Sequence, residues 1–220
     1  MSSHHFVRDK QEPALIIANG QACSDHLLNQ LLEWCPFVLV LDGALDRVLM
    51  KRIKVDAVLG DFDSIEVDRS SVDKFQEVTW IDAPNQDKTD LEKGIEYLIE
   101  NGHKAANIVW ATGKRLDHTI NNVLSMAKYQ SQIELVLLDD HSKCVLVTKA
   151  FSKYYVQGTK LSILPLNPSR GVNSKGLKYE LTNAQLSPTK QTSSSNEVQS
   201  NGVVELTVNS GCLLLIESVD

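Results

Sequence analysis

The sequence has no long apolar run and no excess of basic residues, and each absence excludes a class of protein. No hydrophobic stretch reaches the roughly 20 residues that a membrane-spanning helix needs, and the first residues lack the apolar core of a signal peptide. The 22 lysines and arginines are outnumbered by 28 aspartates and glutamates, which gives a formal net charge of −6. A chain of this charge is not drawn as a whole to nucleic acid or to anionic lipid. We therefore expect a cytoplasmic protein that binds neither.

The chain also has few cysteines, and their spacing is uninformative. No pair among Cys23, Cys35, Cys144 and Cys212 has C-x-x-C spacing, so the sequence predicts neither a zinc site nor a disulfide framework. Reduced, buried thiols are the expected state. The 220 residues, 42% of them hydrophobic, are enough for one large α/β unit or for a medium domain joined to a smaller one.

The first 140 residues alternate apolar runs with stretches of helical period. The apolar runs cover residues 14–18, 37–41, 57–59, 78–81, 105–111 and 133–138. Apolar residues recur at helical spacing over 91–99 and 120–127, and Asn101-Gly102 is a suitable stop for the first of these helices. This alternation predicts a three-layer α/β domain with a parallel sheet.

After about residue 140 the helical stretches disappear. Apolar runs continue over residues 143–148, 154–156, 160–165, 203–208 and 213–218, which predicts an antiparallel β-sandwich domain. Residues 182–202 are rich in Ser, Thr, Asn and Gln and read as a long loop or a β excursion. We therefore divide the chain into an α/β domain over 1–140 and a β-sandwich domain over 141–220.

Almost every predicted parallel strand ends in a short turn that is polar or contains glycine. These turns lie at 19–20, 42–43, 60–61, 82 and 112–113. Because the carboxyl ends of parallel strands form the ligand crevice of an open sheet, the turns predict an acidic site at that edge. Asn, Asp and Gly are also ordinary turn residues, so the pattern alone does not settle the point.

The segment Gly60-Asp61-Phe62-Asp63-Ser64 holds two carboxylates separated by one residue at a strand end. Asp61 and Asp63 project the same way, and their repulsion would be relieved by a hard divalent cation. Mg²⁺ fits, since it is held by a few carboxylates together with water and substrate phosphates. The plainer alternative is a solvated acidic turn in which Ser64 caps the next helix.

Two further segments precede predicted helices. In residues 85–90, Asp87 or Thr89 is the candidate N-cap, while Gln86, Lys88 and Asp90 could supply a hydrogen bond, a cation for phosphate and a metal ligand. In residues 110–118, a glycine turn, two cations and a helix N-terminus coincide, as an oligophosphate site requires, although the Walker A spacing is missing.

The second segment also has a purely structural interpretation. Asp117 could cap the helix and Arg115 could simply pair with it. His118 is a weak candidate for a general base, because a histidine in a first helical turn more often packs or forms a hydrogen bond.

Taken in order, these segments resemble the successive signatures of the thiamin pyrophosphokinase family. They are DGA at 42–44, GDFDS at 60–64, DKTDLEKG at 87–94, ATGKRLDHTINN at 111–122 and SSSNE at 193–197. The resemblance spans nearly the whole chain and implies an α/β domain, a C-terminal β-sandwich and a homodimer. It also implies an activity, the transfer of the β,γ-pyrophosphoryl group of ATP to the hydroxyethyl oxygen of thiamin with release of AMP.

The resemblance and the residue patterns described above together assign roles to individual residues. Mg²⁺ would be held by Asp42, Asp61, Asp63 and Asp90, and the catalytic candidates are Asp61, Asp63, Asp90 and Arg115. ATP would be bound by Lys88, Thr112, Gly113, Arg115, Asp117 and His118, with Asn122 supporting the site. Thiamin would be bound by Gln86, Asp90, Ser195 and Asn196, the last two reaching the pocket across the dimer interface.

The chain departs from the family pattern where many members have paired glycines. Ala44 follows Gly43, and Trp110 and Lys114 flank Thr112-Gly113.

Three other functions remain open on the residues alone. A Mg²⁺-dependent phosphohydrolase would use Asp61 or Asp63 as nucleophile, because D-F-D-S distantly resembles the loop of haloacid-dehalogenase-type phosphatases. A related pyrophosphokinase would act on another alcohol, such as a pterin. A regulatory module would bind a nucleotide without chemistry, although such a module gains little from four mutually repelling carboxylates.

Overall fold

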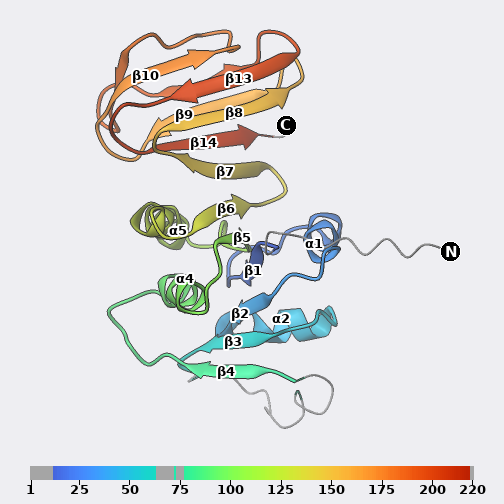
Figure 1. Ribbon diagram of the computed structural model, residues 1–220. Helices are drawn as coiled ribbons and strands as arrows, with labels where there is room; N and C mark the ends of the chain where they lie inside the picture. The colour runs from blue at the N-terminus through green and yellow to red at the C-terminus, as the bar shows by residue number, and fades with distance from the viewer. Residues whose placement is uncertain (1–11, 63–71, 73–76, 219–220) are drawn as a thin grey trace, which may run out of the picture.

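The computed structural model describes residues 12–62, 72 and 77–218, and these residues form a ten-stranded sheet and a four-stranded sheet (Figure 1). The larger sheet has the strand order β12-β9-β14-β7-β6-β5-β1-β2-β3-β4. Its parallel part consists of β1 (Ala14–Ile17), β2 (Val38–Leu41), β3 (Ala57–Gly60), β4 (Thr79–Asp82), β5 (Ala105–Val109) and β6 (Glu134–Leu138). The strands predicted before residue 140 are confirmed.

Helices cover both faces of the parallel part, which confirms the three-layer prediction. They are α1 (Asp25–Leu32), α2 (Leu45–Met50), α4 (Asp90–Glu100) and α5 (Leu116–Tyr129), with a short 3-10 helix η1 (Asp42–Ala44) after β2. Neighbouring strand residues point to opposite faces. In β1, Ile16 is buried in a cluster with residues of α4 and α5, whereas Ile17 is buried with residues of α1 and α2.

The ends of α4 follow the sequence signals. Thr89 is the N-cap, since its Oγ1 accepts a hydrogen bond from the Glu92 backbone N–H at 3.3 Å, while the Thr89 N–H donates to the Glu92 carboxylate at 3.1 Å. This reciprocal capping box satisfies two backbone donors that a helix leaves unpaired. At the other end, Asn101 is the C-cap and Gly102 has a φ of 82°, as a left-handed helix stop requires.

The C-terminal part forms the predicted β-sandwich. The strands β7 (Ser142–Val147), β9 (Lys160–Pro165), β12 (Ser193–Glu197) and β14 (Leu213–Ser218) extend the large sheet, and β8 (Ala150–Tyr155), β10 (Ser169–Lys175), β11 (Ala184–Leu186) and β13 (Gly202–Thr207) form the second sheet. The layers pack through a buried cluster that includes Ile163 and Leu215 from the large sheet and Val172 and Leu206 from the small one. One layer of the sandwich is thus the continuation of the α/β sheet (Figure 1).

The two parts of the chain meet where strand direction changes. β6 pairs in parallel with β5 and in antiparallel fashion with β7, so the sheet is continuous across residue 140. The division of the chain at that residue stays a prediction. Residues 182–202, the predicted loop or β excursion, contain β11 and β12. Within the described ranges, no helix is long and apolar enough to cross a membrane.

Candidate active site

A cavity of about 510 Å³ lies at the carboxyl ends of β1, β2, β3 and β5. The polar turns at 19–20 and 42–43, together with Asp61 and Gly113, contribute to its wall. The remaining wall comes from the segment that leads into α4 and from the start of α5. The cavity therefore occupies the edge at which a parallel sheet presents its ligand site.

Most of the predicted site residues line this cavity. They are Asp42, Asp61, Gln86, Lys88, Asp90, Gly113, Arg115, His118 and Asn122. Of the predicted residues that the structure describes, Thr112, Asp117, Ser195 and Asn196 do not line it. Asp63 lies outside the described residues.

Asp42 is buried and held by backbone N–H groups. Its Oδ1 accepts a hydrogen bond from Gly43 at 2.6 Å, and its Oδ2 accepts one from Phe62 at 3.2 Å. A Cβ on Gly60 would lie 2.0 Å from Oδ2, so the carboxylate occupies space that only glycine leaves open. The end of β3 and the η1 turn thereby fix the orientation of this side chain.

Two other acids lie close enough to Asp42 to affect the pKa of its carboxyl. Burial raises the pKa of its carboxyl, and the neighbouring Asp90 and Asp61 carboxylates raise it further, while hydrogen bonds from Phe62 and Gly43 act in the opposite direction. Bringing carboxylates together in this way is unfavourable without a cation.

The donor chemistry of these acids fits Mg²⁺. Carboxylate oxygens are hard ligands, and Mg²⁺ is usually bound through one or two of them, with water and phosphate oxygens completing the shell. Within the part of the chain that the structure describes, no three His, Cys, Asp or Glu side chains are grouped closely enough to hold a metal ion by themselves. A site of this kind would need water or substrate oxygens as further ligands.

Asp61 and Asp90 each have a neighbour in the cavity wall. Gln86 Nε2 donates to Asp61 Oδ2 at 3.3 Å. Lys93 Nζ donates to Asp90 Oδ1 at 3.1 Å and to the Ala83 carbonyl at 2.8 Å, and its side chain is only 10% exposed. The role of Lys93 was missed, although its position three residues after Asp90 on a helix was a signal that the two side chains could pair.

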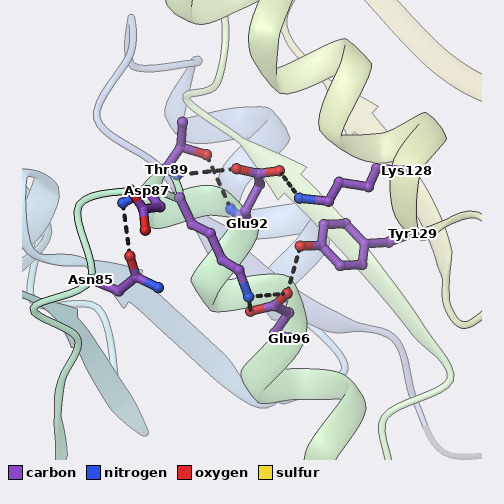
Figure 2. A network of polar contacts seen from close by, with 8 residues as sticks. Asn85, Asp87, Thr89, Glu92, Glu96, Lys128 and Tyr129 are labelled. Atoms are coloured by element: carbon purple, nitrogen blue, oxygen red, sulfur yellow. Dashed lines mark hydrogen bonds and ion pairs between the residues drawn. The ribbon is translucent and has the colours of Figure 1, made fainter.

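Lys88 lines the cavity, but its ammonium is already paired. Its Nζ lies 2.8 Å from both carboxylate oxygens of Glu96, and the Tyr129 hydroxyl donates to Oε1 of Glu96 at 2.7 Å. Figure 2 shows Glu96 and Glu92 on α4 facing Tyr129 and Lys128 on α5. The Lys88 ammonium, followed by the Tyr129 hydroxyl, lowers the pKa of Glu96. This network, which the sequence did not reveal, joins the two helices behind the cavity.

The loop between β5 and α5 has a left-handed backbone at three positions. The φ values are 56° at Trp110, 74° at Gly113 and 53° at Lys114. At Trp110 and Lys114, non-glycine residues therefore adopt a conformation that glycine adopts more easily. The loop is fixed to the first strand's turn, because Gln21 N donates to the Thr112 carbonyl at 2.7 Å.

Arg115 and Asp117 form an ion pair, as expected from the alternative in which these two residues only stabilise the start of the helix. Arg115 Nε donates to Asp117 Oδ1 at 3.1 Å, and both side chains are mostly exposed. The N-cap of α5 is Arg115, not Asp117, so the predicted cap is wrong. The hydroxyl of Thr112 donates to Asp139 at 2.9 Å and is thereby engaged outside the cavity.

Ser195 and Asn196 lie on β12, at the opposite end of the sheet. β12 is six strand positions from β1, which corresponds to about 29 Å at the usual strand spacing of about 4.8 Å. Asn196 is 1% exposed, and its amide bonds the backbone N–H and carbonyl of Tyr179 at 3.1 and 2.8 Å. Ser195 is exposed and has a φ of 55°. Within one chain, neither residue reaches the cavity.

Comparison with known families agrees with this arrangement. Residues 28–137 match the family model for the thiamin pyrophosphokinase catalytic domain, and residues 149–213 match that for the thiamin pyrophosphokinase vitamin B1 binding domain. The chain belongs to the thiamin pyrophosphokinase family. The catalytic-domain match contains the acids of the cavity, and the vitamin B1 binding match contains β12.

Individual thiamin pyrophosphokinases resemble the chain over most of its length. Thiamin pyrophosphokinase 1 of Caenorhabditis elegans is 31% identical over 215 residues, which cover 90% of this chain and 86% of that protein. Thiamine pyrophosphokinase of Bacillus subtilis is 27% identical over 179 residues, covering 76% of this chain and 80% of that protein. The crystal structure of thiamine pyrophosphokinase from Bacillus subtilis superposes with a TM-score of 0.82 at 22% identity, covering 94% of this chain and 99% of that one, and shows the same fold.

Proposed function

We propose that the protein transfers the pyrophosphoryl group of ATP to the hydroxyl of thiamin, giving thiamin diphosphate and AMP. One observation carries this proposal: a single cavity at the sheet edge is lined by the carboxylates of Asp42, Asp61 and Asp90 and by the cations of Lys88 and Arg115. Carboxylates suit a divalent metal, and cations suit phosphate oxygens. A metal-bound polyphosphate needs both kinds of group in the same place.

The proposed reaction is an in-line displacement at the β-phosphorus of ATP. The hydroxyl oxygen of thiamin forms a bond to this phosphorus, while the bond to the oxygen that bridges the α- and β-phosphates breaks and AMP leaves. Arg115 would stabilise the negative charge that develops on the phosphate oxygens. Lys88, whose ammonium is paired with Glu96 in this structure, would do so after turning toward the phosphates. Catalysis of this kind depends mainly on positioning and electrostatics.

Mg²⁺ is the proposed cofactor. It would be held by the predicted ligands Asp42, Asp61, Asp90 and Asp63, some of them directly and others through water, and it would neutralise charge on the phosphates. The backbone N–H groups that bind Asp42 keep its carboxylate in place, and Lys93 restrains Asp90. Because metal ligation and proton acceptance compete for the same carboxylate lone pairs, no single acid is assigned as the base.

The thiamin site is proposed to be shared between two copies of the chain. Gln86 lines the cavity and would face the thiamin pyrimidine. Ser195 and Asn196, the predicted thiamin contacts of the β-sandwich, lie about 29 Å away in the same chain. A second copy could bring its own β12 to the cavity, so we propose a homodimer. Of the two residues, Ser195 is the better placed for this contact because it is exposed. The cytoplasmic location stays a prediction.

The test is a mass-spectrometric assay of the purified protein with ATP, Mg²⁺ and thiamin, omitting each component in turn. Equal formation of AMP and thiamin diphosphate, dependent on thiamin and on metal, is the expected result. AMP without thiamin diphosphate would indicate another alcohol as acceptor. Phosphate release without AMP would indicate a phosphohydrolase, and nucleotide binding without turnover would indicate a binding module.

A further inference from the structure

The side-chain amide of Asn19, in the turn after β1, has its orientation fixed by Arg47 of α2. Arg47 donates one hydrogen bond to Asn19 Oδ1 at 2.8 Å and another to the Gly20 carbonyl at 3.0 Å. A guanidinium group can only donate hydrogen bonds. The amide oxygen of Asn19 must therefore face Arg47, and its NH₂ group must face the other way.

The NH₂ group of Asn19 lies at the cavity wall. Asn19 is exposed and lines the cavity, as does Gly43 beside it. A Cβ on Gly43 would be 2.3 Å from Asn19 Nδ2, so glycine leaves the room that the amide occupies. Among residues 12–62, 72 and 77–218, no acceptor takes a hydrogen bond from Nδ2. The amide thus presents two N–H donors to whatever fills the cavity.

The surroundings of these donors favour an anionic oxygen. Lys114 Nζ donates to the backbone carbonyl of Asn19 at 3.2 Å, which brings an ammonium group to the same turn. Arg115, the next residue, also lines the cavity. N–H donors beside cations are the usual surroundings of a phosphate group. We propose that Asn19 binds a phosphate oxygen of the nucleotide through its amide N–H groups, and that Arg47 is the positioning residue that orients them.

Arg47 is well placed for this positioning role. Its guanidinium lies over the ring of Trp110, 4.6 Å from the ring centroid, and Trp110 is almost completely buried. Stacking on an aromatic face restrains the planar guanidinium, which lysine could not reproduce. The backbone of Gly20 is fixed to the same residue, since its N–H donates to the Trp110 carbonyl. Trp110, Arg47 and the 19–20 turn therefore form one packed unit behind the phosphate site.

Asn19→Asp tests the contact directly. Aspartate has the same shape and keeps an oxygen for Arg47, but it presents a second carboxylate oxygen to the cavity in place of the NH₂ group. The dissociation constant of ATP, measured by calorimetry in EDTA without thiamin, should rise about tenfold or more, with an unchanged melting temperature. The matched control is Asn201→Asp, because Asn201 is exposed on the β-sandwich and its Oδ1 also accepts one hydrogen bond, from Gln157 N.

Arg47→Lys tests the positioning role. In the wild-type background, Arg47→Lys should raise the KM for ATP several-fold and change the KM for thiamin little. In an Asn19→Ala background, Arg47→Lys should have no further effect on the KM for ATP. An equal effect of Arg47→Lys in both backgrounds would mean that Arg47 acts otherwise, for example through stability. Wild-type ATP affinity in both Asn19→Asp and Asn19→Ala would overturn the proposal. The inference rests on the proposed function, but the two can fail separately. If the wild-type protein binds ATP and forms no thiamin diphosphate, the proposed reaction is refuted, and the ATP affinities of the Asn19 variants still test the phosphate contact.

Discussion

The carboxylate of Asp42 lies against the α-carbon of Gly60, and a Cβ added there would be 2.0 Å from Oδ2. Gly60 is the last residue of β3, and Asp42 is the first residue after β2, the neighbouring strand. The register of two parallel strands therefore decides where this acid sits. A side chain at Gly60 would therefore displace the Asp42 carboxylate without replacing any of the proposed metal ligands.

Gly60→Ala should lower turnover by about 100-fold, because the new methyl group must displace the Asp42 carboxylate from its position. The measurement is kcat/KM for thiamin diphosphate formation, together with the melting temperature. Gly202→Ala is the matched control, since the nearest atom to its added Cβ would be the Ser200 carbonyl oxygen at 3.9 Å. Equal activity of the two variants would contradict the importance of this packing.

Asp61→Asn should reduce turnover by at least about 100-fold while leaving the fold intact, because the amide cannot replace a charged metal ligand. Asp61 is exposed, so its replacement should cost little stability, and removing one of several like charges should favour the apo protein slightly. Activity is measured over a Mg²⁺ titration and unfolding by circular dichroism. The control is Asp46→Asn, an exposed acid on α2 that does not line the cavity. Near-normal activity of Asp61→Asn would refute the metal assignment.

The Glu96 network should contribute to stability through Tyr129. Tyr129→Phe removes the hydroxyl that donates to Glu96 at 2.7 Å, and the buried ring is otherwise unchanged. The free energy of unfolding should fall by about 1 kcal/mol. Urea titrations compare this variant with Tyr179→Phe, for which no change is expected because Tyr179 is 64% exposed. In a Glu96→Gln background the effect of Tyr129→Phe should shrink, because the hydroxyl then loses its charged acceptor.

Much of this fold follows from local sequence patterns. The spacing of apolar residues over 91–99 predicts α4, and the short apolar runs predict each strand of the parallel part. Polar turns after those runs indicate the edge of the sheet at which the cavity lies, because parallel strands bring their carboxyl ends together. Such signals are local, so one sequence is enough to detect them.

The features that were missed depend on contacts between distant segments. β10, with the sequence SRGVNSK, is too polar to be recognised as a strand, and it forms because β13 pairs with it. No local pattern reveals that β6 and β7 join both parts of the chain into one sheet. The pairing of Lys88 with Glu96 requires two turns of α4 to be in place, and the orientation of Asn19 depends on a residue 28 positions away.

The stability of the β-sandwich edge should depend on pH through Glu197. Its carboxylate pairs with Lys160 at 2.6 Å and with Lys178 at 2.9 Å, and these two ammonium groups lower its pKa from 4.5 to about 2. Because the pKa is lowered by folding, the stabilisation is present above pH 4.5 and is lost as the pH falls toward 2. Glu197→Gln should therefore melt at a lower temperature than wild type at neutral pH, with the difference shrinking across this window. A difference that stays constant would show that Glu197 contributes through its shape alone.

A shared thiamin site predicts complementation between two inactive variants. If Ser195 acts in the cavity of the partner copy, a heterodimer of one Ser195→Ala chain and one Asp61→Asn chain has both defects in one site and none in the other. Co-expression with two different affinity tags isolates this heterodimer, and its activity per dimer should approach half that of wild type. Each homodimeric variant serves as its own control. If Ser195 served the cavity of its own chain, each site of the heterodimer would carry one defect and activity would stay low, so the two arrangements give opposite results.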